Sequence, residues 1–416
     1  MYIRKIDDSW SFKNADTKEF THCYHSYPAM MIPQVARTLI NEYKPEGHFD
    51  LLFDPYMGSG TSLVEASIVG VNSIGTDLNP LARLMSKVKT THYDEKRIRT
   101  DFSEIQAELI FFDKDKIKDC NFDHISNYSY WYAEDDLLKL SFLTQLINNL
   151  KSENFDFFRV ALSEVVREVS FTRNGEFKRF RMKEEKIKTF KPNVFRLFEE
   201  KIIRNILGLK QYNSISKRPK SYISDFNSTI NIPSDIVSKS SVDMIITSPP
   251  YGDSRTTVAY GQFSRWANEW FGFENAQNLD SCLMGGGKCN QESFVSESIR
   301  KELDDIKKLD EKRYYQVISF LNDYWASIQN VARTVRIGGV SCYVVGNRTV
   351  KGVQIPLDYF TAEMFQKCGF RHEITLVREI PNKRMPSKTS PSNEKGKKVS
   401  TMVNEYIVIM RKINEF

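Results

Sequence analysis

The amino-acid sequence predicts an α/β fold with a mostly parallel sheet, interrupted by a mainly helical insertion. A strand, a glycine-rich turn, a helix and a second strand follow one another between residues 49 and 76, as in a βαβ unit. An apolar strand at 242–246 marks the return of the same kind of pattern. Residues 95–220 lie between these blocks and are rich in charged and aromatic residues at helical spacing.

The composition of the 416-residue chain is that of a globular protein, with 41% hydrophobic and 27% charged residues. Its apolar runs, such as Met244–Ile246, have the length of strands, so we expect no membrane span. The N-terminus lacks the apolar core of a signal peptide, which predicts a cytoplasmic protein. None of the six cysteines has another at a two-residue spacing, so we expect no metal site and no disulfide framework.

Residues 1–94 form the first block of the predicted fold. A loop leads into a helix that should begin near Pro33, because proline favours the first helical position. The βαβ unit then comprises a strand at Phe49–Phe53, a helix at Thr61–Val69 and a strand at Asn72–Thr76. The turn between the first strand and the helix is the first candidate for a ligand site, because ligands bind beyond the carboxyl ends of parallel strands.

Residues 221–416 form the second block, with a smaller insertion at about 273–310. The last two strands of this block could pair as an antiparallel hairpin. The expected elements are a strand at Val242–Ile246, a helix near Arg313–Val335, a strand at Val340–Val345, a helix at Pro356–Cys368 and strands at Glu373–Glu379 and Glu405–Met410.

The glycine-rich turn has the sequence Asp-Pro-Tyr-Met-Gly-Ser-Gly-Thr and begins at Asp54. Gly58 and Gly60 allow a tight turn and a close approach of the backbone to a ligand. Asp77 ends the next strand, where a carboxylate can accept hydrogen bonds from both hydroxyls of a ribose. Leu63 stands where a dinucleotide-binding motif would have its third glycine, and no Gly-Lys-Ser/Thr ending is present, which disfavours NAD and ATP. Alone, this turn is also compatible with a simple helix cap.

A proline-rich turn, Thr-Ser-Pro-Pro-Tyr-Gly, directly follows the buried strand at Val242–Ile246. Pro249 and Pro250 make the turn rigid at the carboxyl end of the strand. Their carbonyl oxygens and Ser248 can accept hydrogen bonds from a planar amino group, and Tyr251 offers a ring for stacking on an extruded base. The turn therefore predicts a site of chemistry on an amino nitrogen.

Together, the two turns resemble those of the DNA amino-methyltransferases, a family with a Rossmann-like fold. The resemblance covers residues 20–90 and 222–412 and implies S-adenosylmethionine as the cofactor. It also implies that His25-Ser-Tyr-Pro contacts the methionine end of the cofactor and that Asp225 contacts its adenine. The cofactor-binding residues so implied are Tyr27, Pro28, Asp54, Pro55, Gly58, Gly60, Thr61, Asp77 and Asp225.

Serine at the first position of the catalytic tetrapeptide, Ser248–Tyr251, is typical of the cytosine-N4 enzymes of this family, whereas adenine enzymes usually have Asp or Asn there. The chain lacks a Pro-Cys dipeptide, which disfavours the thiolate chemistry of cytosine-C5 methylation. An adenine-N6 enzyme, an RNA amino-methyltransferase and an inactive nucleic-acid-binding protein remain as alternatives.

Basic residues concentrate in parts of a chain whose net charge is only +6, which indicates a polyanion partner, and the resemblance implies that this partner is double-stranded DNA. Residues 151–220 carry 18 Lys and Arg against 9 Asp and Glu, although a solvated helical face would look similar. We expect residues 95–220 to recognise the target and residues 172–182 to form a hairpin turning at Asn174-Gly175. The candidate DNA-binding residues are Arg173, Lys178, Arg179, Arg181, Arg255, Lys383 and Arg384.

The resemblance also implies a restriction-modification or related system, with a restriction endonuclease that acts separately, and a monomer is favoured.

Overall fold

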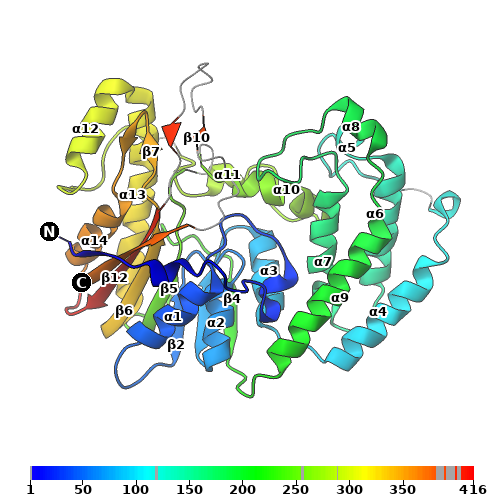
Figure 1. The fold of residues 1–416 in the computed structure, drawn as a ribbon, viewed down its shortest axis with the longest axis horizontal. Helices are drawn as coiled ribbons and strands as arrows, with labels where there is room; N and C mark the ends of the chain where they lie inside the picture. The colour runs from blue at the N-terminus through cyan, green and yellow to red at the C-terminus, as the bar shows by residue number, and fades with distance from the viewer. Residues whose placement is uncertain are drawn as a thin grey trace.

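The computed structural model describes residues 2–117, 120–253, 257–287, 289–380, 388–389, 399–400 and 404–416. Within these residues an eight-stranded sheet has the order β1-β9-β12-β6-β5-β2-β3-β4 (Figure 1). Its strands are β1 (Arg4–Ile6), β2 (Leu51–Asp54), β3 (Asn72–Thr76), β4 (Ser221–Ser224), β5 (Val242–Thr247), β6 (Val335–Val345), β9 (Phe370–Glu379) and β12 (Asn404–Lys412).

Strand β12 is antiparallel to both of its neighbours, β6 and β9, whereas the other neighbouring pairs are parallel. The expected α/β fold and the C-terminal antiparallel pair are therefore confirmed. Two strands of this eight-stranded sheet were not expected from the sequence: β1, whose three residues are all exposed, and β4, whose residues are partly exposed at the sheet edge. Neither has the apolar run that marks a central strand.

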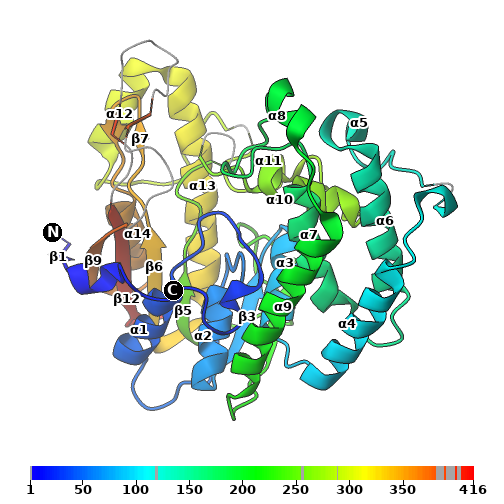
Figure 2. The ribbon, with the colours of Figure 1, turned by 45° about the vertical axis from the view of Figure 1, so that its right-hand side comes forward.

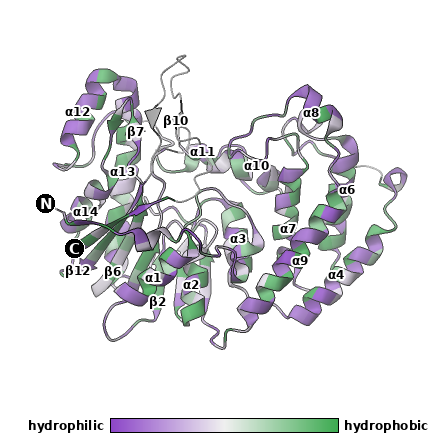
Figure 3. Ribbon diagram, in the orientation of Figure 1, coloured by the Kyte–Doolittle hydropathy of each residue, from purple (hydrophilic) through white to green (hydrophobic). Residues whose placement is uncertain are grey.

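Helices cover both faces of this sheet because successive residues of a buried strand point to opposite sides. On β2, Leu52 packs in a core with α1 (Pro33–Tyr43) and α2 (Thr61–Val69), and Phe53 packs in another with α13 (Glu311–Thr334) and α14 (Leu357–Lys367). Figure 3 shows hydrophobic residues along the central strands and mainly hydrophilic ones on outer helices such as α12 (Arg300–Leu309).

Residues 95–220 form a body of helices beside the sheet, as Figures 1 and 2 show. Their apolar faces enclose a third core, which includes the fully buried rings of Phe157, Phe158 and Phe198 and also Trp266, which belongs to residues 221–416. The helices of this core are α3 (Pro80–Thr90), α4 (Glu95–Leu109), α6 (Glu134–Asn148), α7 (Phe155–Glu168), α9 (Val194–Asn213) and α10 (Tyr260–Trp270).

The hairpin expected at residues 172–182 forms only in part. Thr172 and Arg181 form one isolated antiparallel bridge, and the residues between them make a wide loop with a turn at Asn174-Gly175. Polar side chains on both faces leave such a segment without the packing that would extend a regular strand pair. No helix in the described parts of the chain is long and apolar enough to cross a membrane.

The order of the strands places the two ligand-binding turns side by side. Chain order in the sheet reverses between β2 and β5, which pair in parallel through Leu52 and Met244 and through Phe53 and Ile245. Such a reversal leaves a crevice beyond the carboxyl ends of the two strands. The turns that begin at Asp54 and Ser248 therefore open into the same crevice.

Candidate active site

A hydrogen bond joins the two turns. Thr247, the last residue of β5, donates its hydroxyl hydrogen to Asp54 Oδ1 at 2.6 Å. The same carboxylate accepts a bond from the backbone N–H of Tyr56 at 3.1 Å and another from the hydroxyl of Ser62. Burial raises the pKa of Asp54 to about 6, and the three donors oppose that rise. Asp54 therefore fixes the glycine-rich turn against the strand that carries the proline-rich turn.

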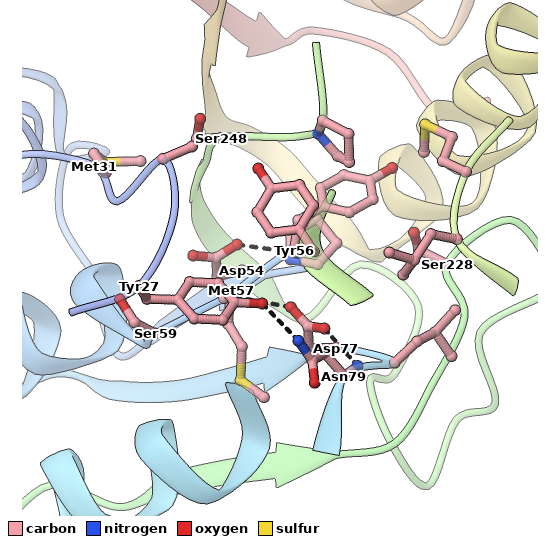
Figure 4. Close-up of a pocket in the computed structure, with 18 of the residues that line it drawn as sticks. Tyr27, Met31, Asp54, Tyr56, Met57, Ser59, Asp77, Asn79, Ser228 and Ser248 are labelled. Atoms are coloured by element: carbon pink, nitrogen blue, oxygen red, sulfur yellow. Dashed lines mark hydrogen bonds between the residues drawn. The ribbon is translucent and has the colours of Figure 1, made fainter. Parts of the chain in front are cut away.

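A pocket lies between the two turns and is shown in Figure 4. Of the residues predicted to bind the cofactor or to act in catalysis, most line it, and they come from four separate segments of the chain. The predicted residues on its wall are Tyr27, Pro28, Asp54, Pro55, Gly58, Thr61, Asp77, Ser248 and Pro250.

Asp77 projects from the end of β3 into this pocket. Its Oδ2 accepts a bond from the N–H of Gly58 at 3.0 Å, and its Oδ1 accepts one from the N–H of Asn79 at 2.8 Å. Each carboxylate oxygen keeps a lone pair for a ligand hydroxyl. Burial raises the pKa of Asp77 to about 6, against the two backbone bonds that lower it.

Two predicted cofactor residues do not line this pocket. Gly60, with φ of +77°, faces α3, where a Cβ would lie 2.7 Å from the hydroxyl oxygen of Ser86, so its close approach is to the helix. Asp225 is exposed and forms an ion pair with Arg83 at 2.9 Å. Asp225 therefore lies outside the wall of this pocket, and the residues that follow it, 226–229, line the pocket instead.

Sequence reasoning missed Asn79, which organises one wall of the pocket. Its side-chain N–H donates to the hydroxyl of Tyr27 at 2.8 Å and to that of Ser264 in α10 at 3.1 Å. Tyr27 also stacks on Tyr260 of α10, with ring centroids 5.9 Å apart. The signal was the Asn-Pro pair just after Asp77, because Asn79 caps α3.

The residues of the proline-rich turn lie in two different environments. Ser248 and Pro250 line the pocket, while Pro249 is buried behind it. The hydroxyl of Tyr251 lies 3.1 Å from that of Ser248 and donates to Glu405 at 3.2 Å, and its ring packs in the core. The ring of Tyr251 is therefore not part of the wall of this pocket. Burial raises the pKa of this phenol well above its ordinary value.

Asp253, just after this turn, is buried. Its carboxylate accepts a bond from Arg348 at 3.2 Å, and burial lowers the pKa of that guanidinium. This pair fastens the end of the turn to the loop after β6. Three predicted DNA contacts, Arg255, Lys383 and Arg384, lie outside the described residues.

The remaining DNA-binding candidates differ in their surroundings. Arg173 is exposed, and Lys178 is partly exposed. Arg179 instead lies over the Trp266 ring at 4.7 Å, and burial lowers its pKa to about 10. Arg181 stacks on Tyr130 at 4.2 Å and donates to the carbonyl of the same residue at 2.9 Å. Arg179 and Arg181 therefore hold the loop, and only the first two residues are free to face a partner.

Comparisons with known proteins identify the class to which this fold and site belong. A family model described as DNA methylase matches residues 3–87. The chain is 37% identical to the Type II methyltransferase M.MvaI of Kocuria varians, covering 98% of this chain and 95% of the relative. It is 22% identical to the Type II methyltransferase M.BsoBI of Geobacillus stearothermophilus, covering 89% and 84%.

Among solved structures, a putative DNA modification methylase from Thermus thermophilus, complexed with S-adenosyl-L-methionine, aligns with 18% identity and a TM-score of 0.21 over 43% of this chain and 50% of that chain. The protein belongs to the type II DNA methyltransferases of the N4/N6 amino-methyltransferase family, and S-adenosylmethionine is its cofactor.

The residues of the pocket fit this cofactor. Asp77 has lone pairs for the ribose hydroxyls, and the two carboxylates of the pocket suit a ligand that carries positive charge on its sulfonium and ammonium groups. Tyr27, Pro28 and Tyr260 add apolar surface to the same wall. The cofactor supplies a methyl group on a positively charged sulfur.

Cofactor binding should depend on pH because two pocket carboxylates have raised pKa values. Asp54 and Asp77 titrate near pH 6 in the folded chain, against 3.8 for the ordinary group. Below about pH 6 they become neutral and lose their attraction for the cationic ligand. We expect affinity to fall about tenfold between pH 7 and pH 5, the effect of one group with a pKa of 6. Calorimetric titration at several pH values measures this change.

The same raised pKa values affect the stability of the cofactor-free protein in the opposite direction: cofactor affinity rises with pH, whereas stability falls. Since the folded pKa values lie above the unfolded ones, these two groups should lower the free energy of unfolding as pH rises from about 4 to about 6. Asp77→Asn should flatten both pH dependences. Cofactor affinity that is constant from pH 5 to pH 7 would contradict the assignment of these carboxylates to the binding site.

Proposed function

We propose that this protein transfers the methyl group of S-adenosylmethionine to the exocyclic N4 amino group of a cytosine flipped out of duplex DNA. The observation that carries this proposal is the position of Ser248. Ser248 lines the same pocket as Asp54 and Asp77, at the end of the strand next to the cofactor turn. Serine at this position is the residue typical of the cytosine-N4 enzymes that the turn resembles.

The residues of the turn support the chemistry in a simple way. The hydroxyl oxygen of Ser248 and the carbonyl oxygens of the prolines can accept the two N–H bonds of the amino group. With both hydrogens held, the nitrogen keeps a lone pair to direct at the methyl carbon, so no general base needs to act before the attack. As the nitrogen–carbon bond forms, the bond between the methyl carbon and the sulfur would break, and the methylated nitrogen would then lose one proton through Ser248 or to solvent. Asp54 and Thr247 hold this turn in register with the cofactor turn. The result is alignment of the two reacting atoms.

Sequencing that detects modified bases, applied to DNA from cells that express the protein, tests this proposal. N4-methylcytosine at one short recurring sequence is the expected result and would also reveal the recognition site. N6-methyladenine at such a sequence would assign the chain to the adenine enzymes. Methylation of this site would protect the DNA from a restriction endonuclease that acts separately on the same sequence.

Target recognition belongs, in this proposal, to residues 95–220, between the cofactor half at 1–94 and the catalytic half at 221–416. The loop at 172–182 supports it, because Arg173 is exposed there, although it forms an ion pair with Glu176 at 3.3 Å and lies over the ring of Phe180 at 5.9 Å. Arginine and lysine on such a loop can contact phosphates and base edges of a duplex. The protein would act on DNA as a monomer.

The double variant Arg173→Ala/Lys178→Ala should weaken binding to duplex DNA and flatten its salt dependence. Each lost phosphate contact lowers the slope of log affinity against log salt by about 0.9. Fluorescence anisotropy with labelled duplex at several salt concentrations measures the slope. Cofactor affinity should not change, because neither residue lines the pocket.

The matched control is Lys96→Ala/Arg99→Ala on α4, which removes the same charge from the insertion. The 172–182 loop leads into α8 (Glu184–Thr189), and α4 is well separated from α8 in Figure 1. It should retain native affinity and slope. If the control and the loop variant lose the same amount, the effect is one of net charge, and the loop is not the recognition surface.

A further inference from the structure

The carboxyl end of β9 brings a charged pair to the catalytic edge of the sheet. Arg378 and Glu405 stand directly opposite each other in the β9–β12 pair, and Arg378 Nη1 donates to Glu405 Oε2 at 2.9 Å. Because β12 is antiparallel to both β6 and β9, the end of β9 and the start of β12 lie at the same edge as the end of β5. Ser248 follows β5 at that edge.

A chain of hydrogen bonds runs from this pair to the pocket. Glu405 Oε1 accepts from the hydroxyl of Tyr251 at 3.2 Å, and the oxygen of that hydroxyl lies 3.1 Å from the hydroxyl of Ser248. Ser248 then lines the pocket. Three side chains from two distant parts of the sequence therefore connect the buried arginine to the place where the amino group would bind.

The donor directions along this chain follow from the groups at its far end. A carboxylate can only accept, so Tyr251 must donate to Glu405. The phenol oxygen then accepts the hydrogen of Ser248, and the lone pairs of the serine oxygen are left for the pocket. A hydroxyl hydrogen points toward the strongest acceptor within reach, and the carboxylate of Glu405 is a stronger acceptor than the hydroxyl oxygen of Ser248.

Arg378 fixes the acceptor at the start of the chain. Its side chain is 2% exposed, and among the described residues Glu405 is the only side chain with which it forms an ion pair or hydrogen bond. A buried guanidinium is tolerated when it is paired, which keeps the carboxylate in place. The arginine has no acceptor atoms, so it cannot reverse the chain.

We propose that Glu405 is a positioning residue that sets the direction of this hydrogen-bond chain, so that Ser248 presents a lone pair and not a hydrogen to the base. A donor such as the amino group of cytosine is then accepted, and a base with a carbonyl oxygen at the same position, such as uracil, is rejected. The inference rests on the proposed cytosine-N4 function and adds a determinant of base specificity that acts through Tyr251.

The variant Glu405→Gln tests this direction. Glutamine keeps an acceptor oxygen, which Arg378 will take, and this places the amide NH₂ toward Tyr251. The chain then reverses, and the hydrogen of Ser248 faces the pocket. We expect the single-turnover rate of methyl transfer to fall at least tenfold, because a hydrogen bond to the amino group becomes a clash of two donors.

The second readout is base preference, which a purely structural role would not change. With the target cytosine of a short duplex replaced by uracil, the wild-type protein should bind less tightly to the uracil duplex than to the cytosine duplex. In Glu405→Gln this preference, the ratio of the two dissociation constants, should fall at least tenfold, mainly through tighter binding of uracil. Tyr251→Phe, which leaves the Arg378 pair intact, should also lower the rate and the preference.

Glu373→Gln is the matched control. Glu373 pairs with Arg411 between the same two strands but toward the other end of β9, and its Oε1 lies 2.5 Å from Arg411 Nε. This variant should keep the native rate and base preference. If Glu405→Gln and Tyr251→Phe make N4-methylcytosine at the native rate with native preference, the inference is wrong while the proposed function stands. If the wild-type protein makes no N4-methylcytosine, the proposed function itself fails.

Discussion

Replacing Ser248 by alanine should lower the rate of methyl transfer about 100-fold, the typical loss for one preorganised hydrogen bond at a reacting group. Ser248 lies on the pocket wall at the end of β5, where it can hold an N–H of the amino group. Without it, the nitrogen is less well aligned with the methyl carbon. Cofactor affinity should remain native, because Asp54 and Asp77 are unchanged.

Rapid-quench measurement of a single turnover, together with calorimetry of cofactor binding, separates these two effects. Ser241→Ala is the matched control, because Ser241 directly precedes β5 at its opposite end and its hydroxyl donates to the backbone carbonyl of Ser238. It should retain the native rate. A Ser248→Ala variant with native turnover would place the chemistry outside this pocket.

Replacing Asp77 by alanine should weaken cofactor binding at least tenfold. Each hydrogen bond to a charged group contributes about 1.5–3 kcal/mol, and the two ribose hydroxyls would both lose their acceptor. The variant also loses two hydrogen bonds within the protein, because the carboxylate of Asp77 accepts the backbone N–H groups of Gly58 and Asn79. These two bonds hold the glycine-rich turn in shape. Calorimetry of S-adenosylmethionine or of its demethylated product measures the change.

Asp225→Ala is the matched control for Asp77→Ala. Both aspartates follow a strand at the same edge of the sheet, but Asp225 pairs with Arg83 and does not line the pocket. Its removal should change cofactor affinity by less than about threefold, as for an exposed ion pair. Equal losses in the two variants would mean that the cofactor extends beyond the described pocket toward Asp225.

The sequence was sufficient to predict the central part of the fold. The helix at Thr61–Val69 and the strand at Asn72–Thr76 have the predicted bounds, because glycines and a change of hydrophobic period mark their ends. Strands β1 and β4 could not be predicted in this way. They lie at the two edges of the sheet, and a short edge strand is specified by its neighbour more than by its own residues.

The part of the site that is formed by turns at strand ends could be predicted from the sequence. The hydrogen bonds and ring contacts between side chains far apart in the sequence could not. Asp54, Asp77 and Ser248 stand at strand ends, so the topology brings them together. Tyr251 turns toward Glu405, a residue 154 positions away, and no local pattern contains that hydrogen bond. Arg179 likewise stacks on Trp266, which lies in residues 221–416. The number of basic residues in a segment cannot predict a contact between residues so far apart in the sequence.

The product of the reaction tests the central assignment most directly. Duplex DNA that carries the recognition sequence is incubated with the purified protein and S-adenosylmethionine with a deuterated methyl group, then digested to nucleosides for mass spectrometry. We expect deuterated N4-methylcytosine from the wild-type protein, and no such product from Ser248→Ala at the early times of a single turnover. Deuterated N6-methyladenine, or nucleosides without the label, would contradict it.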